Sequence, residues 1–114
     1  IVFGQVHGGI GQGVGQALME RTVYDDEGQL LTGSFLDYAM PHADDFPHFD
    51  IQARPVPATT NPLGVKGCGE AGCAGSLPTI VNAAIDALAP LGVTHLDTPL
   101  TPPRVWQALR EARR

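Results

Sequence analysis

Two glycine-rich segments limit what this chain can fold into. The first, GQVHGGIGQGVGQAL, covers residues 4–18, and the second, NPLGVKGCGEAGCAG, covers residues 61–75. Together they contain all but three of the 14 glycines in the 114 residues. Glycine has no side chain to bury and loses more conformational freedom on folding than any other residue. Such segments are therefore either slack loops or places where the backbone approaches another group closely.

The first segment predicts a helix. Each glycine costs a helix about 1 kcal/mol relative to alanine, a cost that close packing or a ligand would offset. The helical spacing is defined by Ile10, Val14, Ala17, Leu18 and Arg21.

Extended structure is predicted next. Residues 22–24 and 30–35 are separated by a turn signal at residues 25–28, which is typical of a β-hairpin. Residues 49–53 alternate apolar and polar side chains up to Pro55, which predicts a further strand. The stretch before that strand, LDYAMPHADDFPHF, is rich in proline and aspartate and is typical of a solvated loop.

A helix is predicted after a long loop at residues 59–75. Ser76 is expected to cap it, with Pro78 in its first turn and Gly92 beyond its end. Loops of this length inside a compact domain are usually functional or disordered.

A last helix is predicted to start with Thr101 as its cap and Pro102 in its first turn. No linker divides the chain, so residues 1–114 are expected to form one unit. The predicted fold class is α+β, with helices packed on a small antiparallel sheet.

The charge distribution argues against a nucleic-acid partner. The net charge is -5, and the only basic cluster is Arg110, Arg113 and Arg114, whereas a phosphate-backbone surface needs clustered lysine and arginine. No apolar run approaches the roughly 20 residues that span a bilayer, and no signal-peptide pattern is present. A cytoplasmic location without a membrane span is expected.

The chain opens without methionine, on the apolar residues IVF, which suggests a piece cut from a longer polypeptide. Helix faces that pack on the missing parts would then be exposed. The isolated chain is therefore expected to self-associate.

The run GGIGQGVG invites comparison with dinucleotide-binding loops, but its spacing does not fit. The fingerprint needs glycines at the first, third and sixth positions, and the sixth position is Gln16 counted from Gly11 and Val14 counted from Gly9. Two interpretations stay open. The helix either packs tightly on a neighbour, or points its N-terminal N–H groups at an anion.

The two cysteines do not predict a metal site. Cys68 and Cys73 are separated by four residues, whereas zinc pairs are usually closer and need two further ligands. The four histidines are scattered. Small buried thiols are the preferred interpretation.

Glu70 is the only acid in its glycine-rich segment. An ordinary solvent-exposed loop acid is one interpretation. The other starts from the surrounding glycines, because backbone of so little bulk can lie against a large planar or phosphorylated ligand. An acid held there can act as a general base. Lys66 and the start of the following helix would hold an anion nearby.

The pair of segments GQVHGGIGQGVGQAL and NPLGVKGCGEAG resembles the C-terminal part of the molybdenum-binding large subunit of the xanthine oxidase family. Within that family, which includes aldehyde oxidases, the chain is most similar to the bacterial branch that includes aerobic carbon monoxide dehydrogenase large chains and aldehyde or isoquinoline oxidoreductases. The resemblance covers nearly all 114 residues, as far as LTPPRVWQAL.

The resemblance implies an oxidoreductase that hydroxylates a carbon centre, or oxidises carbon monoxide, with oxygen from water. The implied cofactor is molybdenum on a molybdopterin, often as the cytosine dinucleotide in bacteria. Iron–sulfur clusters and FAD would lie on other domains or subunits. The implied partners are those subunits, the rest of the large subunit and a small-molecule substrate, and the isolated segment is expected to be inactive.

The resemblance also implies roles for particular residues. The family's GxGE glutamate matches Glu70, whose implied role is to take a proton from the water-derived oxygen as that oxygen attacks the substrate carbon. The family's QG pair matches Gln12 and Gly13, which are expected near the molybdenum or its pterin. Cofactor contacts are also expected at Lys66, Gly67 and Gly69.

Two departures qualify the match. Xanthine oxidases proper carry an acid at the position of His7, which favours the bacterial branch here, and often have GEPP instead of GEAG, which leaves the substrate open. The competing hypothesis is a non-catalytic module whose glycine-rich surface binds another protein.

Overall fold

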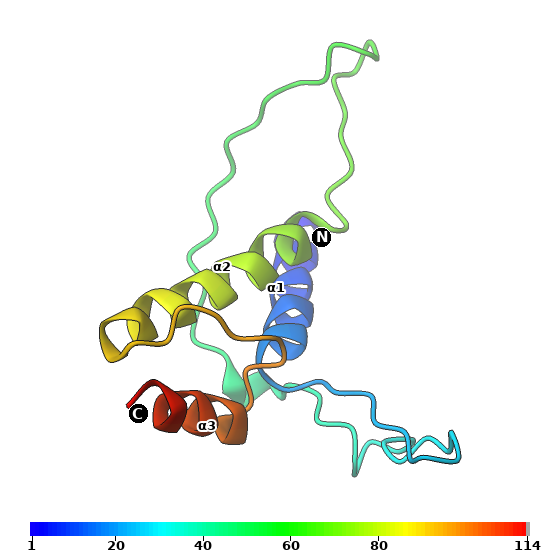
Figure 1. Ribbon diagram of the computed structural model, residues 1–114. Coiled ribbons are helices and arrows are strands. Elements are labelled where there is room, and N and C mark those ends of the chain that lie inside the picture. The colour runs from blue at the N-terminus through cyan, green and yellow to red at the C-terminus, as the bar shows by residue number, and fades with distance from the viewer. Residues whose placement is uncertain (114) are drawn as a thin grey trace.

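Three helices joined by long irregular segments make up residues 1–113, the part of the chain that the computed structural model describes (Figure 1). The helices are α1 (Val2–Leu18), α2 (Ala71–Leu88) and α3 (Pro102–Ala112). Single 3-10 turns occur at η1 (Ala43–Asp45) and η2 (Ala89–Leu91). None of the helices in residues 1–113 has the length and apolar character needed to cross a membrane.

The contact between α1 and α2 is the centre of the fold, and it depends on glycine. Gly9, Gly13 and Gly72 are buried where the helices cross. A Cβ atom on Gly9 would lie 2.7 Å from the backbone nitrogen of Cys73, and one on Gly13 would lie 2.8 Å from that of Leu77. The predicted first helix is confirmed as far as Leu18, whereas Arg21, which its spacing included, lies beyond its end. Tight packing on a neighbour accounts for part of its glycine content.

The prediction that Ser76 caps the second helix is wrong. Helix α2 begins six residues earlier than predicted, at Ala71, with Glu70 as its N-cap, and Pro78 lies inside it. The early start follows from packing, because the backbone of Gly72 lies against Val6 and Ile10 of α1. That contact outweighs the low helix propensity of AGCAG. Within α2, the hydroxyl of Thr79 donates to the carbonyl of Gly75, one turn before it, at 2.6 Å.

The C-terminal segment has the helix end and helix start that the sequence predicts, although the side chain of Thr101 makes no capping hydrogen bond. The helical run ends at Gly92, which has a left-handed φ of 90°, and α3 starts at Pro102 directly after Thr101. Val93 and Leu100 are buried, and the amide of Leu100 donates to the carbonyl of Ala17 at 2.6 Å. The segment before α3 is thereby attached to the end of α1.

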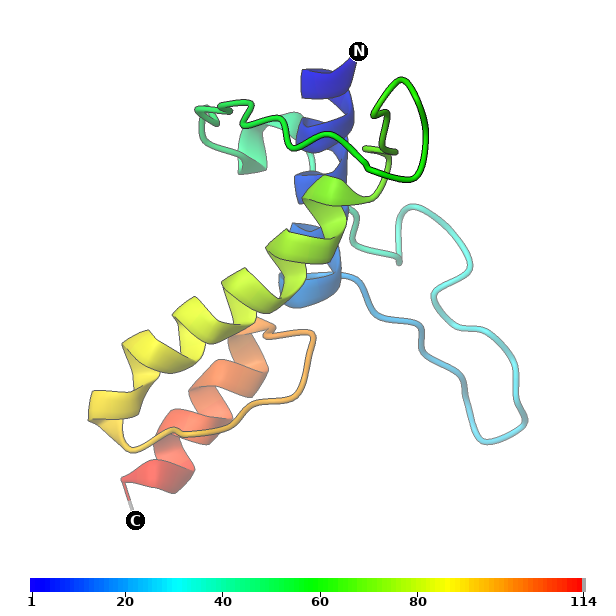
Figure 2. The same ribbon diagram turned by 90° about the horizontal axis from the view of Figure 1, so that it is seen from above.

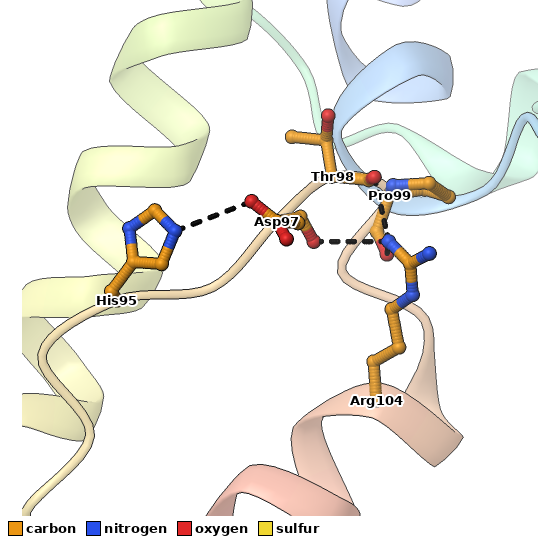
Figure 3. Close-up of polar contacts among 5 residues, drawn as sticks. All are labelled: His95, Asp97, Thr98, Pro99 and Arg104. Carbon is orange, nitrogen blue, oxygen red and sulfur yellow. Dashed lines mark hydrogen bonds and ion pairs between the residues drawn. The ribbon is translucent and has the colours of Figure 1, made fainter.

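A single arginine ties α3 to the segment that precedes it (Figure 3). Nη1 of Arg104 donates to the carbonyl oxygens of Thr98 at 2.6 Å and of Asp97 at 3.2 Å. His95 and the carboxylate of Asp97 are 3.2 Å apart at the surface. The connection between η2 and α3 is therefore held by carbonyl contacts to Arg104 together with the burial of Val93 and Leu100.

The predicted α+β class, with helices on a small antiparallel sheet, is wrong. Within residues 1–113 the hairpin is reduced to one isolated bridge between Tyr24 and Leu30. The turn itself is present, since Gly28 has a φ of 83° and its amide donates to the carbonyl of Asp25 at 3.1 Å. A two-stranded ribbon is only marginally stable in water, and Leu31 and Phe35 are 53% and 87% exposed.

The strand predicted at residues 49–53 is also wrong. No residue from 49 to 58 belongs to a ladder, because no neighbouring strand is available to pair with it. Phe49 instead lines an apolar groove between α1 and α2. Residues 47–70 leave the helices as a long excursion, seen at the top of Figure 1.

The described residues do not enclose a core of their own. Ala17, Val93 and Leu100 are the only buried hydrophobic residues among them. The accessible surface is 8619 Å², whereas a compact monomer of 12.0 kDa exposes about 6000 Å². The radius of gyration is 17.9 Å, against about 13 Å expected for a compact chain of this length. Figure 2 shows the same open arrangement from above.

The isolated chain is therefore still predicted to self-associate, since apolar helix faces such as those around Trp106 are left exposed. Analytical ultracentrifugation over a range of concentrations is the measurement. A sedimentation coefficient that rises with concentration is expected. A stable monomer at every concentration would contradict the prediction.

Candidate functional site

Glu70 lies at the junction between the long loop and α2. It is the N-cap residue of α2, and its backbone carbonyl accepts from the amide of Ala74 at 2.9 Å. Its side chain is exposed and makes no capping hydrogen bond. Within residues 1–113 the structure gives its carboxylate neither a hydrogen bond nor an ion pair. The carboxylate is thus held by its backbone alone and is open to a group outside the described residues.

The loop glycines before Glu70 differ from the helix glycines. A Cβ on Gly67 or Gly69 would have no atom within 4 Å among the described residues, and neither glycine has a positive φ. Neither local conformation nor packing within residues 1–113 requires glycine at these positions. The open space beside this backbone is the feature expected where a ligand or another part of a protein approaches closely.

Lys66 lies on the loop that leads to Glu70, beside a shallow depression. It is exposed, and together with Arg54 it lines an open depression whose walls include Pro55, Pro57 and Leu63. Two cationic side chains are therefore present on the loop that leads to Glu70. A positive surface of this kind suits an anionic ligand.

Gln12 and Gly13 are neighbours in sequence with different surroundings. Gly13 is buried, and a Cβ there would meet the hydroxyl of Ser76. This contact explains the glycine without a cofactor, and the expected cofactor contact at Gly13 stays a prediction. Gln12 is exposed and lines a hollow of about 320 Å³. The other residues of that hollow are Gly8, Gly11, Glu20, Met40, Pro41 and Phe46.

The helix crossing brings the two glycine-rich segments together. Gly9 contacts Gly72 and Cys73 across the crossing. Gln12 lies one helical turn after Gly9, and Glu70 lies two residues before Gly72. Both predicted site residues are therefore carried by helix segments that meet at this crossing.

The residues at this crossing fit an anionic, flat organic cofactor better than a metal held by side chains. Within residues 1–113 no group of three or more histidine, cysteine, aspartate or glutamate side chains is placed to hold a metal ion. In contrast, the cationic side chains of Lys66 and Arg54 suit an anionic group. The start of α2 adds little to this, because the amide of Ala71 donates to the carbonyl of Cys68 at 3.3 Å and that of Cys73 faces Gly9 of α1. The unfilled space at Gly67 and Gly69 would accept a planar ring. A metal in this site would be carried by the cofactor.

Sequence reasoning missed the wall that faces Gln12. The sequence predicts a solvated loop for Tyr38, Met40 and Phe46, yet Met40 and Phe46 line the hollow of Gln12 and Tyr38 bonds to Glu20. No hydrophobic periodicity marks these residues. The sequence feature related to this contact is Gly15. In the structure a Cβ at this position would meet the carboxyl group of Glu20.

Comparison with known proteins places these segments in a family. The family model for the molybdopterin cofactor-binding domain matches residues 1–47. The chain is 40% identical over 111 residues to the carbon monoxide dehydrogenase large chain of Hydrogenophaga pseudoflava, covering 97% of this chain and 14% of that one. It is 42% identical over 110 residues to the nicotine 6-hydroxylase large subunit of Paenarthrobacter nicotinovorans, covering 96% of this chain and 14% of that one.

A solved structure extends the match to three dimensions. The quinoline 2-oxidoreductase of Pseudomonas putida 86 superimposes with a TM-score of 0.91 and 40% identity, over 96% of this chain and 14% of that chain. The open shape of residues 1–113 therefore recurs inside a far longer protein. The chain spans 14% of the length of the two relatives named above. The matched family model, relatives and solved structure show that the chain belongs to the xanthine oxidase family of molybdenum-binding oxidoreductase large subunits.

Proposed function

We propose that residues 1–114 are the C-terminal part of the molybdopterin-binding domain of a molybdenum hydroxylase, and that Glu70 is its general base. The observation that carries the proposal is the setting of Glu70: an exposed carboxylate without a partner in residues 1–113, beside loop glycines that nothing in those residues explains. The large exposed surface supports the same conclusion, because a segment of a larger subunit has its core completed by the remainder.

Each residue has a distinct task in this proposal. When bound, the molybdenum–molybdopterin cofactor activates water and accepts the two electrons that leave the substrate. Glu70 accepts the proton released as the water-derived oxygen attacks the substrate carbon, since a carboxylate within hydrogen-bond reach is a suitable base. The amide of Gln12 donates a hydrogen bond at the cofactor, which fixes its orientation. Lys66, Gly67 and Gly69 hold its anionic part.

The remaining expectations concern the complete protein. The rest of the large subunit, and iron–sulfur and FAD subunits or domains, are the proposed partners. The cytosine dinucleotide form of the pterin, the cytoplasmic location and the inactivity of the isolated segment also stay predictions. The relatives named as a large chain and a large subunit support the idea of partner subunits.

The reaction class can be tested by isotope labelling. The complete parent enzyme, offered N-heterocycles and aldehydes, is expected to hydroxylate at least one of them. With a heterocyclic substrate in ¹⁸O-water, one labelled oxygen should appear in each product molecule, as measured by mass spectrometry. The control is ¹⁸O₂ in ordinary water, which should give unlabelled product. Label from O₂ would rule out the proposed chemistry.

A non-catalytic interaction module remains the alternative, and one observation favours it. The groove between α1 and α2 is apolar and open, with Val6, Ile10, Phe49 and Ile80 on its walls. A module of this kind would tolerate Glu70→Gln and instead lose binding when the groove is altered. The Glu70 variant therefore separates the two functions.

A further inference from the structure

A hydrogen bond between distant residues stands beside the hollow of Gln12. The hydroxyl of Tyr38 donates to Oε2 of Glu20 at 2.8 Å, and the pair is partly buried. The amide of Glu20 in turn donates to the carbonyl of Gly15 at 2.8 Å. A Cβ on Gly15 would meet the carboxyl group of Glu20. The glycine at position 15 thus leaves room for the carboxylate that receives the tyrosine.

This hydrogen bond holds the segment after Tyr38 against α1. A Cβ on Gly15 would lie 3.0 Å from Pro41, and one on Gly11 would lie 3.4 Å from the ring of Phe46. The segment is also closed locally, because the amide of His42 donates to the carboxylate of Asp45 at 2.7 Å. Residues 38–46 therefore form a short wall with one anchor on the end of α1 and another against its middle.

Aromatic contacts extend the wall beyond Phe46. The rings of Phe46 and Phe49 are 6.2 Å apart, and those of Phe49 and His7 are 5.4 Å apart. The wall is therefore fixed on α1 at both ends, by the Tyr38 hydrogen bond and by this ring cluster. Loss of the hydrogen bond would release only the end near Met40.

The Glu20 carboxylate also favours the protonated form of the Tyr38 hydroxyl. The hydrogen bond to Glu20, then desolvation, then the negative charge of Glu20 raise the pKa of Tyr38 above its usual value of 10.0. A raised pKa means that the neutral, donating form is present at lower pH and is lost only as pH rises through that pKa. The contact is therefore intact throughout the neutral range.

Gln12 itself has no fixed partner in residues 1–113. It is exposed, and a glutamine side chain with several rotatable bonds takes up one orientation only when its neighbours impose it. Besides Glu20 itself, the side chains that line its hollow from outside α1 are Met40, Pro41 and Phe46. A shift of this wall would change the space into which the amide can turn.

We propose that the Glu20–Tyr38 pair positions Gln12, by holding Met40, Pro41 and Phe46 as the wall of its hollow. The inference rests on the proposed function, in which Gln12 contacts the cofactor. Tyr38 and Glu20 are positioning residues in this inference, because they act on the cofactor only through the wall and Gln12.

The test compares four single variants of the complete, molybdenum-loaded parent enzyme. Tyr38→Phe removes only the hydroxyl. Tyr24→Phe is the matched control, because Tyr24 is 60% exposed and lies outside the wall. Glu20→Gln keeps an oxygen that accepts the tyrosine hydrogen bond, whereas Glu20→Ala removes it. Molybdenum content, hydrogen exchange of residues 38–46, and kcat and KM are measured for each.

We expect Tyr38→Phe and Glu20→Ala to retain molybdenum, to exchange faster in residues 38–46, and to lose kcat by about 10- to 100-fold, as a small misplacement near a reacting centre does. Tyr24→Phe and Glu20→Gln should behave like the parent. Faster exchange with parental kcat and KM would overturn the inference, because the wall would then not affect Gln12. Parental exchange and kcat together would also overturn it.

A double variant identifies the route of the effect. If Tyr38 acts through Gln12, Tyr38→Phe added to Gln12→Ala should cause no further loss of kcat. Additive losses would contradict positioning of Gln12. A fully active Gln12→Ala enzyme with its molybdenum retained would overturn the proposed role of Gln12 itself and this inference with it. An impaired Gln12→Ala enzyme beside a parental Tyr38→Phe enzyme would overturn the positioning role alone.

Discussion

Glu70→Gln in the complete parent enzyme should slow reduction of the molybdenum centre by substrate about 10²- to 10⁴-fold, the usual contribution of a general base. The amide matches the carboxylate in size but cannot accept a proton. The carboxylate has no partner in residues 1–113, so the substitution removes no contact that holds those residues together. Single-turnover reduction, followed spectroscopically at equal molybdenum content, is the measurement.

Asp86→Asn is the matched control for this substitution. Asp86 is exposed near the far end of the same helix, and its loss of charge is identical. It should reduce at the parental rate. If Glu70→Gln also reduced at the parental rate with full molybdenum content, the acid would be a bystander. The open space at Gly67 and Gly69 would then have to be explained by a protein partner.

The helices that the sequence predicts well are those with local signals. Thr101 and Pro102 mark the start of α3 by backbone preference alone, and Gly92 ends a helical run through its positive φ. The start of α2 could not be predicted in this way. Its first turn is helical because Gly72 packs on α1, and that contact joins residues more than 60 positions apart.

The predicted strands failed for a related reason. Alternation in residues 49–53 predicts an extended backbone with one buried face, but a strand exists only beside another strand. The burial that the pattern anticipates is in part met by helices, since Phe49 lines the groove between α1 and α2. The alternating pattern therefore identified Phe49 as a side chain that packs, but it did not identify the two helices on which Phe49 packs.

The candidate site was predictable in part. Gln12 and Glu70 were singled out by motif, and the structure brings their segments to one crossing. Tyr38 could not be found in the same way, because a hydrogen bond between a loop tyrosine and a glutamate 18 residues earlier leaves no periodic trace. The only sequence feature related to its partner Glu20 is Gly15, which is one glycine within a run of glycines.

Gly72→Ala should be the most disruptive single-methyl change in the crossing. A Cβ at position 72 would meet the carbonyl oxygen of Val6 and lie 2.9 Å from the amide nitrogen of Ile10. Both are backbone atoms, which cannot rotate away as a side chain would. Overpacking of this kind costs about 1–3 kcal/mol and sometimes more. Thermal unfolding of the complete parent enzyme, together with its yield of molybdenum-loaded protein, is the measurement.

Gly75→Ala separates overpacking from a general effect of alanine. Gly75 is in the same helix one turn later, and a Cβ there would have no atom within 4 Å in the described residues. Alanine should be neutral within those residues, or stabilising by up to about 1 kcal/mol through its helix propensity. Unchanged unfolding of Gly72→Ala would mean that α1 and α2 do not approach this closely. Destabilisation of Gly72→Ala alone, with reduced turnover, would show that the crossing places Glu70, because Glu70 lies only two residues from the displaced backbone.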